Sequence, residues 1–458
     1  MSNDHIGTAE HALRIAKEAG AHFADVVISE GRSTSVKVRK ADVEEVTQSR
    51  ERALGIRVLV GAPGSLRTAT TSTSDLSRDA VTRLVEAAVS LARYTAPDPF
   101  ADPPDPELAT FVAEADAPRD LETWDEAVYR LGADAAIALA LRTEAAALDA
   151  DRTLLTNSEG AELSWGFSET HVLTSRGTHQ HRRSTSVSLW TTPVAEKNGE
   201  KQRDYWWSSA RHFADLLSPE EIGRIAAART LRRLGARKPK TTEVPVIYEA
   251  PIASRMLGAI GGAINGSALF RDASYLCGKL GETIANERIT VKDDPWIVRG
   301  AASRLIDGEG IPTRPMTLVE RGVLKSYVLD TYTGKKLGMP STRSAWRGLG
   351  SPSPGTSNLW MDNGEQSLDA LIAEVDEGLL VTDTFGGGAN TVTGDYSQGA
   401  VGIWIEKGQL AYPVDELTIA SKLPTIWATV DGVANDRHPG RATSAPSFRV
   451  AKMTVAGV

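Results

Sequence analysis

The sequence predicts an α+β protein in which an N-terminal antiparallel sheet with helices is followed by a mainly β C-terminal domain. Strand-like runs between residues 23 and 60 lie between two amphipathic helix patterns. Beyond residue 237, short alternating runs are separated by glycine-rich turns. A chain of 458 residues also exceeds the roughly 250–300 residues that one hydrophobic core serves, so we expect two or three domains.

Composition and charge exclude several classes of function. The chain is 41% hydrophobic and 24% charged, with a net charge of -8, so we do not expect nucleic acid or anionic lipid to be the main partner. A single cysteine, Cys277, cannot form an intramolecular disulfide, which favours a reducing compartment. No apolar segment approaches the ~20 residues of a membrane span, and no export signal opens the sequence. We therefore expect a cytoplasmic protein without a membrane partner.

Residues 1–95 are predicted to form the N-terminal α+β unit. A helix is expected over residues 8–19, and a second helix over residues 75–94 presents an apolar face to the sheet. Between them, strands over residues 23–29, 33–39, 43–49 and 54–60 predict an antiparallel meander, which ends at a turn over residues 61–64.

Residues 96–118 form a proline-rich linker in this interpretation, because repeated prolines disfavour regular helix and central strand. Residues 119–236 are a central helix and strand region that packs with the N-terminal unit. An alanine-rich helix is expected over residues 124–148, then a second sheet layer with strands over 152–156, 163–174 and 184–192 and a turn at 157–160. Ser218 and Pro219 predict a helix start, and Gly235 its end.

Residues 237–458 are predicted to be the mainly β C-terminal domain. Strands are expected over residues 244–248, 289–292 and 401–406. A hairpin turn is expected at residues 406–409, and a terminal strand over residues 448–455.

The motifs of common hydrolases are missing from the sequence. None of the eight histidines is followed by glutamate, which excludes every zinc motif that begins His-Glu. There is no Gly-x-Ser-x-Gly sequence, and Cys277 lies in a moderately apolar segment typical of a buried structural thiol. We therefore assign no catalytic residue and no metal ligand to this chain.

Three histidines leave one metal hypothesis open. His179 and His181 would share one face of a strand, and His171 could join them only if a neighbouring strand aligned it. The adjacent Arg182 and Arg183 would repel a cation, so a solvated strand end is the preferred interpretation.

Acidic pairs such as Asp293 with Asp294 and Asp307 with Glu309 could serve acid–base chemistry in a cleft, although turn and cap roles are commoner for such pairs.

Gly386, Gly387 and Gly388 follow a strand-like run without the Lys-Ser/Thr of a phosphate loop. Glycines here allow close approach of another strand or of a bound peptide backbone.

Several segments together resemble the TldD/PmbA family. The resemblance rests on residues 53–61, Ser274-Tyr275-Leu276, Asp307-Gly308-Glu309-Gly310, Gly386-Gly387-Gly388-Ala389-Asn390 with Thr393-Gly394-Asp395-Tyr396-Ser397, residues 402–408, and Val455-Ala456-Gly457. TldD-type members carry His-Glu-x-x-x-His on a helix, whereas the PmbA type, also called TldE, lacks it. Residues 250–260, where that helix is expected, contain neither histidine nor a carboxylate in register, so this chain resembles the PmbA type.

The resemblance implies the non-metal-binding subunit of a heterodimeric metallopeptidase that cleaves small or unfolded peptides. Zinc is then expected on the TldD-type partner and no cofactor on this chain. Candidate peptide-binding residues are Gly386, Gly387, Gly388, Asn390, Thr393, Gly394, Asp395 and Tyr396. One alternative is a homodimeric peptide-binding or regulatory protein without hydrolysis, and another is a metal-independent hydrolase that uses Ser, Asp or Cys277.

Overall fold

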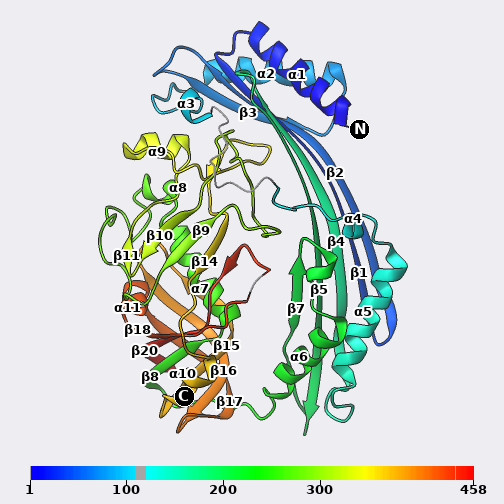
Figure 1. Ribbon diagram of the computed structural model, residues 1–458, viewed down its shortest axis with the longest axis vertical. Coiled ribbons are helices and arrows are strands. Elements are labelled where there is room, and N and C mark those ends of the chain that lie inside the picture. The colour runs from blue at the N-terminus through cyan, green and yellow to red at the C-terminus, as the bar shows by residue number, and fades with distance from the viewer. Residues whose placement is uncertain (1, 110–119, 439, 458) are drawn as a thin grey trace.

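The computed structural model, which describes residues 2–109, 120–438 and 440–457, places a long twisted antiparallel sheet beside a separate C-terminal unit (Figure 1). The sheet has seven strands in the order β3-β2-β1-β4-β5-β6, with β7 paired to β5. The mixed architecture confirms the predicted α+β class. Within the described residues, no helix is both long enough and apolar enough to cross a membrane.

The centre of the sheet is one long hairpin. β1 (Phe23–Arg39) and β2 (Asp42–Val60) pair antiparallel along their whole length, from Phe23 with Leu59 to Arg39 with Asp42. We predicted four short strands here, which is wrong, because the polar residues at the expected breaks continue the ladder and an ion pair joins Glu30 to Arg50.

The turn of this hairpin uses two non-glycine residues with positive φ. Lys40 and Ala41 have φ of 53° and 60°, a conformation that ordinarily favours glycine or asparagine. The carboxylate of Glu144 accepts hydrogen bonds from both backbone amides, at 2.9 and 3.0 Å. This side chain therefore stabilises the turn from a distant helix.

The remaining strands extend the same sheet. They are β3 (Arg67–Thr73), β4 (Asn157–Thr174), β5 (His179–Lys197), β6 (Glu200–Arg203) and β7 (Trp206–Ala210). The predicted second layer is wrong, because β4 pairs directly with β1. Residues 152–156 form no strand, and the expected turn at residues 157–160 is an irregular start of β4 whose register shifts between Ser158 and Ala161.

Helices cover one face of the sheet, here called the outer face. α1 (Ser2–Glu18) and α2 (Arg78–Tyr94) pack on Val26, Ile28 and Ile56 at one end. α5 (Ala133–Leu148) packs on Val36 and Val38 at the other end.

α6 (Pro219–Leu231) lies against α5, and its N-cap Ser218 accepts a hydrogen bond from Glu221 as the sequence predicts. The predicted single helix over residues 124–148 is wrong, because α4 (Glu126–Tyr129) ends before Gly132 caps α5. Short helical turns occur at α3 (Pro106–Ala109) and η1 (Phe213–Asp215), and the part of the predicted linker over residues 110–118 lies outside the described residues.

The opposite, inner face of the sheet meets the C-terminal unit (Figure 1). Asp25 of β1 forms an ion pair with Arg347. Gly55 of β2 lies so close to Leu349 that a Cβ atom would stand 2.1 Å from its carbonyl oxygen. Glycine is thus required where the two units touch.

Five strands of the C-terminal unit form a closed ring. β8 (Thr242–Tyr248), β15 (Glu377–Ala389), β16 (Asp395–Glu406), β17 (Gln409–Lys422) and β20 (Phe448–Ala456) pair in circular order, since β17 also pairs with β20. The predicted hairpin at residues 406–409 is confirmed by the pairing of Glu406 with Gln409. α7 (Ala250–Ala263) follows β8, and Ile252, Met256 and Ile260 on its buried face belong to the core of this unit.

A second sheet in the order β11-β10-β9-β14-β19 completes the C-terminal unit. Its strands are β9 (Val291–Asp294), β10 (Met316–Glu320), β11 (Val323–Leu324), β14 (Asn358–Met361) and β19 (Thr443–Ser444). The other elements are α8 (Gly266–Leu269), α9 (Thr331–Leu337), β12 (Ala345–Trp346), β13 (Ser353–Pro354), α10 (Leu368–Ala373), α11 (Leu423–Ala428) and β18 (Val430–Val433).

Candidate functional site

The predicted glycine run forms a bulge at the end of β15. The register of β15 with β16 shifts between Phe385 and Gly388. Gly386 and Gly387 have φ of 62° and 21°, and a Cβ on Gly387 would lie 2.2 Å from the Ser397 carbonyl oxygen. The glycines therefore permit the close strand approach that the sequence predicts.

The other predicted residues lie in the adjoining turn. The Asn390 side chain accepts hydrogen bonds from the amides of Val392 and Thr393, at 3.0 and 3.3 Å. The Thr393 hydroxyl donates to Asp395 at 2.6 Å. Asn390, Thr393 and Asp395 are exposed, whereas Gly394 and Tyr396 are buried. The set thus shares one hairpin tip, but the Tyr396 side chain belongs to the core and its burial raises the pKa of the phenol to about 12.

The edge of β15 that leads to this bulge is open. Its parallel pairing with β8 covers only Leu379–Val381, so among the described residues the later part of β15 has β16 as its only strand neighbour. A side chain contacts the open edge instead, because Arg255 of α7 donates to the Thr384 carbonyl and to the Asp383 carboxylate, both at 3.3 Å. A backbone edge of this kind can accept an extended chain.

A cavity of about 570 Å³ lies between the sheet and the C-terminal unit. Its lining includes Gln180 and Arg182 of β5 and residues 303–308 and 345–347 of the C-terminal unit. The guanidinium of Arg304 lies 3.9 Å from the ring centroid of Trp346, and that of Arg182 lies 5.9 Å from it. Arginine side chains from two distant parts of the chain therefore converge on one cavity.

The side chains of Arg304 and Arg347 are buried without full compensation. Nε and Nη1 of Arg304, and the same atoms of Arg347, have no hydrogen-bond partner within the described parts of the chain. Burial lowers the pKa of Arg304 and of Arg347 to about 10. Burial also raises the pKa of the neighbouring Asp307 to about 6 and of Asp293 to about 7, so these carboxylates supply less negative charge than exposed ones would. The cavity can hold an anionic group such as a carboxylate.

The acidic pairs considered for acid–base chemistry serve turns and caps. Asp307 accepts hydrogen bonds from the amides of Glu309 and Ile311, at 2.8 and 3.0 Å. Glu309 accepts from the amide of Thr331 at the start of α9, at 2.9 Å. Asp294 accepts from the amide of Trp296 at 2.7 Å. Burial raises the pKa of the Cys277 thiol, which makes it a poor nucleophile.

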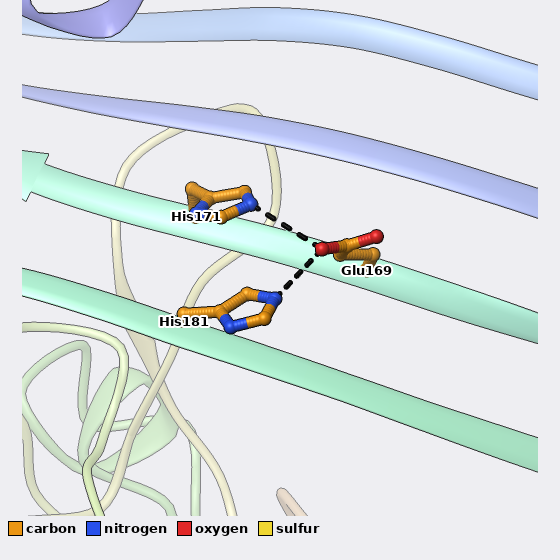
Figure 2. A group of neighbouring side chains, drawn as sticks. All are labelled: Glu169, His171 and His181. Carbon is orange, nitrogen blue, oxygen red and sulfur yellow. Dashed lines mark hydrogen bonds and ion pairs between the residues drawn. The ribbon is translucent and has the colours of Figure 1, made fainter. Parts of the chain in front are cut away.

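The structure brings His171, His181 and Glu169 together on the outer face, as Figure 2 shows. His171 of β4 pairs in register with His181 of β5, so the alignment that the sequence left open is realised. The ligand atoms of these three residues all lie within 4.8 Å of one another. His171 is buried, so the preferred solvated strand end describes His179 and His181 but is wrong for His171.

Sequence reasoning missed the arginine cavity and Glu169. Arg182 entered only as a source of repulsion, and Arg304 and Arg347 carry no motif. The one available signal was the cluster of basic and histidine residues over 179–183.

Comparisons with known proteins agree along most of the chain. Three family models match consecutive segments: PmbA/TldA metallopeptidase domain 1 over residues 24–92, the central domain over residues 128–234 and the C-terminal domain over residues 241–457. The chain is 36% identical to metalloprotease PmbA of Escherichia coli O157:H7, over 95% of this chain and 92% of the relative. It is 35% identical to a PmbA homologue of Haemophilus influenzae, over 97% and 94% of the two chains.

Solved structures share the whole fold. A protein from Bacteroides thetaiotaomicron, described as a candidate modulator of DNA gyrase, is 30% identical with a TM-score of 0.88, over 99% of this chain and 98% of that chain. TldE from Thermococcus kodakarensis has a TM-score of 0.85 at 22% identity, over 98% and 100% of the two chains.

Proposed function

The chain belongs to the PmbA/TldD metallopeptidase family, and from this premise we propose that it is the TldE-like subunit of a heterodimeric metallopeptidase. In this proposal the TldD-type partner holds the catalytic zinc and cleaves small or unfolded peptides. The present chain provides no catalytic metal and contributes to peptide binding. The complex would act in peptide maturation or degradation in the cytoplasm.

The observation that carries this proposal is the side chain at the open edge of β15. α7 is the helix on which the family resemblance places the metal motif of TldD-type members. Here α7 presents Arg255, which forms an ion pair with Asp383. A guanidinium at this position repels a divalent cation and occupies the carboxylate that could have bound it.

The open edge of β15 also supports the proposed peptide binding. An extended peptide can add to β15 through backbone hydrogen bonds, as in other cases of strand addition. Phe385 borders this edge with 52% of its surface exposed and can pack against a peptide side chain. The exposed members of the predicted set, Gly386, Gly387, Asn390, Thr393 and Asp395, extend the contact along the hairpin tip.

The arginine cavity offers a contact for peptide carboxylates. Arg304 and Arg347 have nitrogen atoms that face no acceptor, and charge-assisted hydrogen bonds from guanidinium to carboxylate are among the strongest in proteins. A free peptide C-terminus or an acidic side chain in the cavity would lie beside these guanidinium groups, and its charge would offset theirs.

The proposal is tested by assembling the chain with the TldD-type protein of its organism and measuring complex formation and peptide KM. We expect a stable complex, and we expect Phe385→Ala to raise KM about three- to tenfold, since one apolar contact is worth roughly 1 kcal/mol. The matched control is Leu410→Ala, which removes a side chain of similar exposure, 46%, from β17 and should leave KM unchanged. Homodimers that ignore the TldD-type protein would favour the regulatory alternative instead.

A further inference from the structure

We propose that Glu169, His171 and His181 form a binding site for a divalent transition metal ion such as Zn²⁺, built into the outer face of the long sheet (Figure 2). The inference goes beyond the proposed function, which requires no metal on this chain. It concerns binding only, and the cleavage chemistry stays with the partner.

The strand pairing holds the three side chains in place. His171 and His181 occupy paired positions on β4 and β5, and their rings are stacked with centroids 4.4 Å apart and planes 9° from parallel. Glu169 precedes His171 by two residues and therefore lies on the same face of β4. All three side chains project from rigid strands, which suits a preformed site.

Two of the three ligand separations bracket the spacing of a tetrahedral ion, and the shorter one is a hydrogen bond between His181 and Glu169 that a bound ion would replace. Glu169 Oε1 lies 2.7 Å from His181 Nε2 and 3.6 Å from His171 Nε2. Zinc bonds of ~2.0–2.1 Å to nitrogen and oxygen place neighbouring tetrahedral ligands about 3.4 Å apart. The observed separations lie on either side of this value, so small side-chain rotations bring the atoms to bonding distance. Two histidines and one carboxylate leave a fourth position for water.

His171 supplies the independent sign of a missing ligand. It is 2% exposed, and its Nε2 atom has no hydrogen-bond partner, which is costly for a buried polar atom. Its Nδ1 atom lies 3.3 Å from His179 Nε2. With the proton on Nδ1, His171 donates to His179 and directs the Nε2 lone pair toward the Glu169 carboxylate, where a metal cation can bind both. A metal-bound histidine typically donates a hydrogen bond from its other ring nitrogen in this way.

Only one of the two arginines beside the histidines lies on the same face as the proposed site. Arg182 points to the inner face, where its guanidinium lies 5.9 Å from the Trp346 ring centroid. Arg183 stands opposite Glu169 in the ladder, on the same face as His181, and its guanidinium stacks 4.8 Å from the Trp124 ring centroid. Glu30 of β1 stands opposite Glu169 in the ladder and forms an ion pair with Arg50 at 2.7 Å.

An ion can reach the site from solvent. Glu169 is half-buried and His181 is exposed, and His181 also borders the arginine cavity. On the buried side, the His5 ring of α1 packs edge-on against His171 with centroids 6.1 Å apart. The bound ion would join β4 to β5 beside the N-terminal helix and should raise the stability of this end of the sheet.

The test is a zinc titration of the full-length chain after chelator treatment, with a chromophoric chelator as competitor. We expect one site per chain. Glu169→Gln, His171→Ala and His181→Ala should each weaken zinc binding by about 100-fold or more, and His179→Ala by the ~10–100-fold typical of outer-shell partners. The control His22→Ala removes a histidine from the segment between α1 and β1 and should leave the affinity unchanged.

A thermal-melting series provides the second readout. Zinc should raise Tm of the parent chain and of His22→Ala, and should leave Tm of Glu169→Gln unchanged. Glu169→Gln preserves the shape of the site, so it separates loss of zinc binding from the misfolding that a histidine substitution could cause. The inference is overturned if zinc does not bind, or if the Glu169, His171 and His181 variants bind it as the parent does. Zinc-dependent peptide cleavage by the lone chain would instead contradict the proposed function while leaving the binding site intact.

Discussion

A buried ion network connects the sheet to the C-terminal unit, and neutralising its one carboxylate should destabilise the protein strongly. Asp25 accepts hydrogen bonds from Arg57 Nε at 2.9 Å and from Arg347 of the C-terminal unit, and all three side chains are buried. Asp25→Asn keeps the shape and deprives two guanidinium groups of the carboxylate that both of them contact. Removing one partner of a buried pair costs about 3–5 kcal/mol, so we expect the free energy of unfolding to fall by that amount.

Urea unfolding followed by tryptophan fluorescence measures this change as a lower midpoint at constant slope. Glu18→Gln is the control, because it breaks the exposed ion pair with Arg14 and should cost less than about 1 kcal/mol. Adding Arg347→Met to Asp25→Asn should recover part of the loss by removing one uncompensated charge. A loss below about 1 kcal/mol for Asp25→Asn would refute the reasoning.

Three further predictions concern the bulge, a buried acid and the cavity. Gly387→Ala should lower the free energy of unfolding by about 1–3 kcal/mol, because the added Cβ meets the Ser397 carbonyl. The control Gly258→Ala, on the exposed face of α7, should raise it by about 0.5–1 kcal/mol. Urea unfolding measures both changes, and equal effects of the two substitutions would contradict this prediction. Burial raises the pKa of Glu309 to about 8, above its usual ~4.3. Stability should therefore fall as pH rises between these values. The fall should be shallower in denaturation curves of Glu309→Gln, in which the raised pKa values of Asp307 and Asp293 still contribute, and an equal fall in both proteins would contradict this. In the assembled peptidase, Arg304→Met should raise KM about tenfold for peptides with a free C-terminus, and an equal rise for amidated peptides would exclude a carboxylate contact.

Local sequence patterns were sufficient to predict much of the fold. The apolar face of α2, the Ser218 cap of α6 and the hairpin before Gln409 depend on neighbouring residues, and all three are present. The length of β1 and β2 was not predictable in this way. Polar residues near Glu30 and Arg50 resemble loop residues in the sequence, but in the structure they form an ion pair across a continuous ladder. The pairing of β4 with β1 depends on contacts more than a hundred residues apart.

The candidate sites also include one feature that the local sequence indicates and two that depend on contacts between distant segments. The Gly387 bulge needs positive φ and close strand approach, which the sequence itself indicates. The histidine cluster depends on the register of β4 with β5, and the sequence could state that condition without settling it. The cavity brings Arg182 together with Arg304 and Arg347, and no local pattern reports such convergence.

The central claim is that this chain supports peptide cleavage without providing the catalytic metal. Peptide hydrolysis by the lone chain, by the TldD-type protein alone and by the two together, each with and without zinc, tests it most directly. We predict zinc-dependent cleavage by the pair that survives Glu169→Gln in this chain and disappears when the His-Glu-x-x-x-His histidines of the partner are replaced. Cleavage by the lone chain, or by a pair whose partner lacks those histidines, would contradict the account.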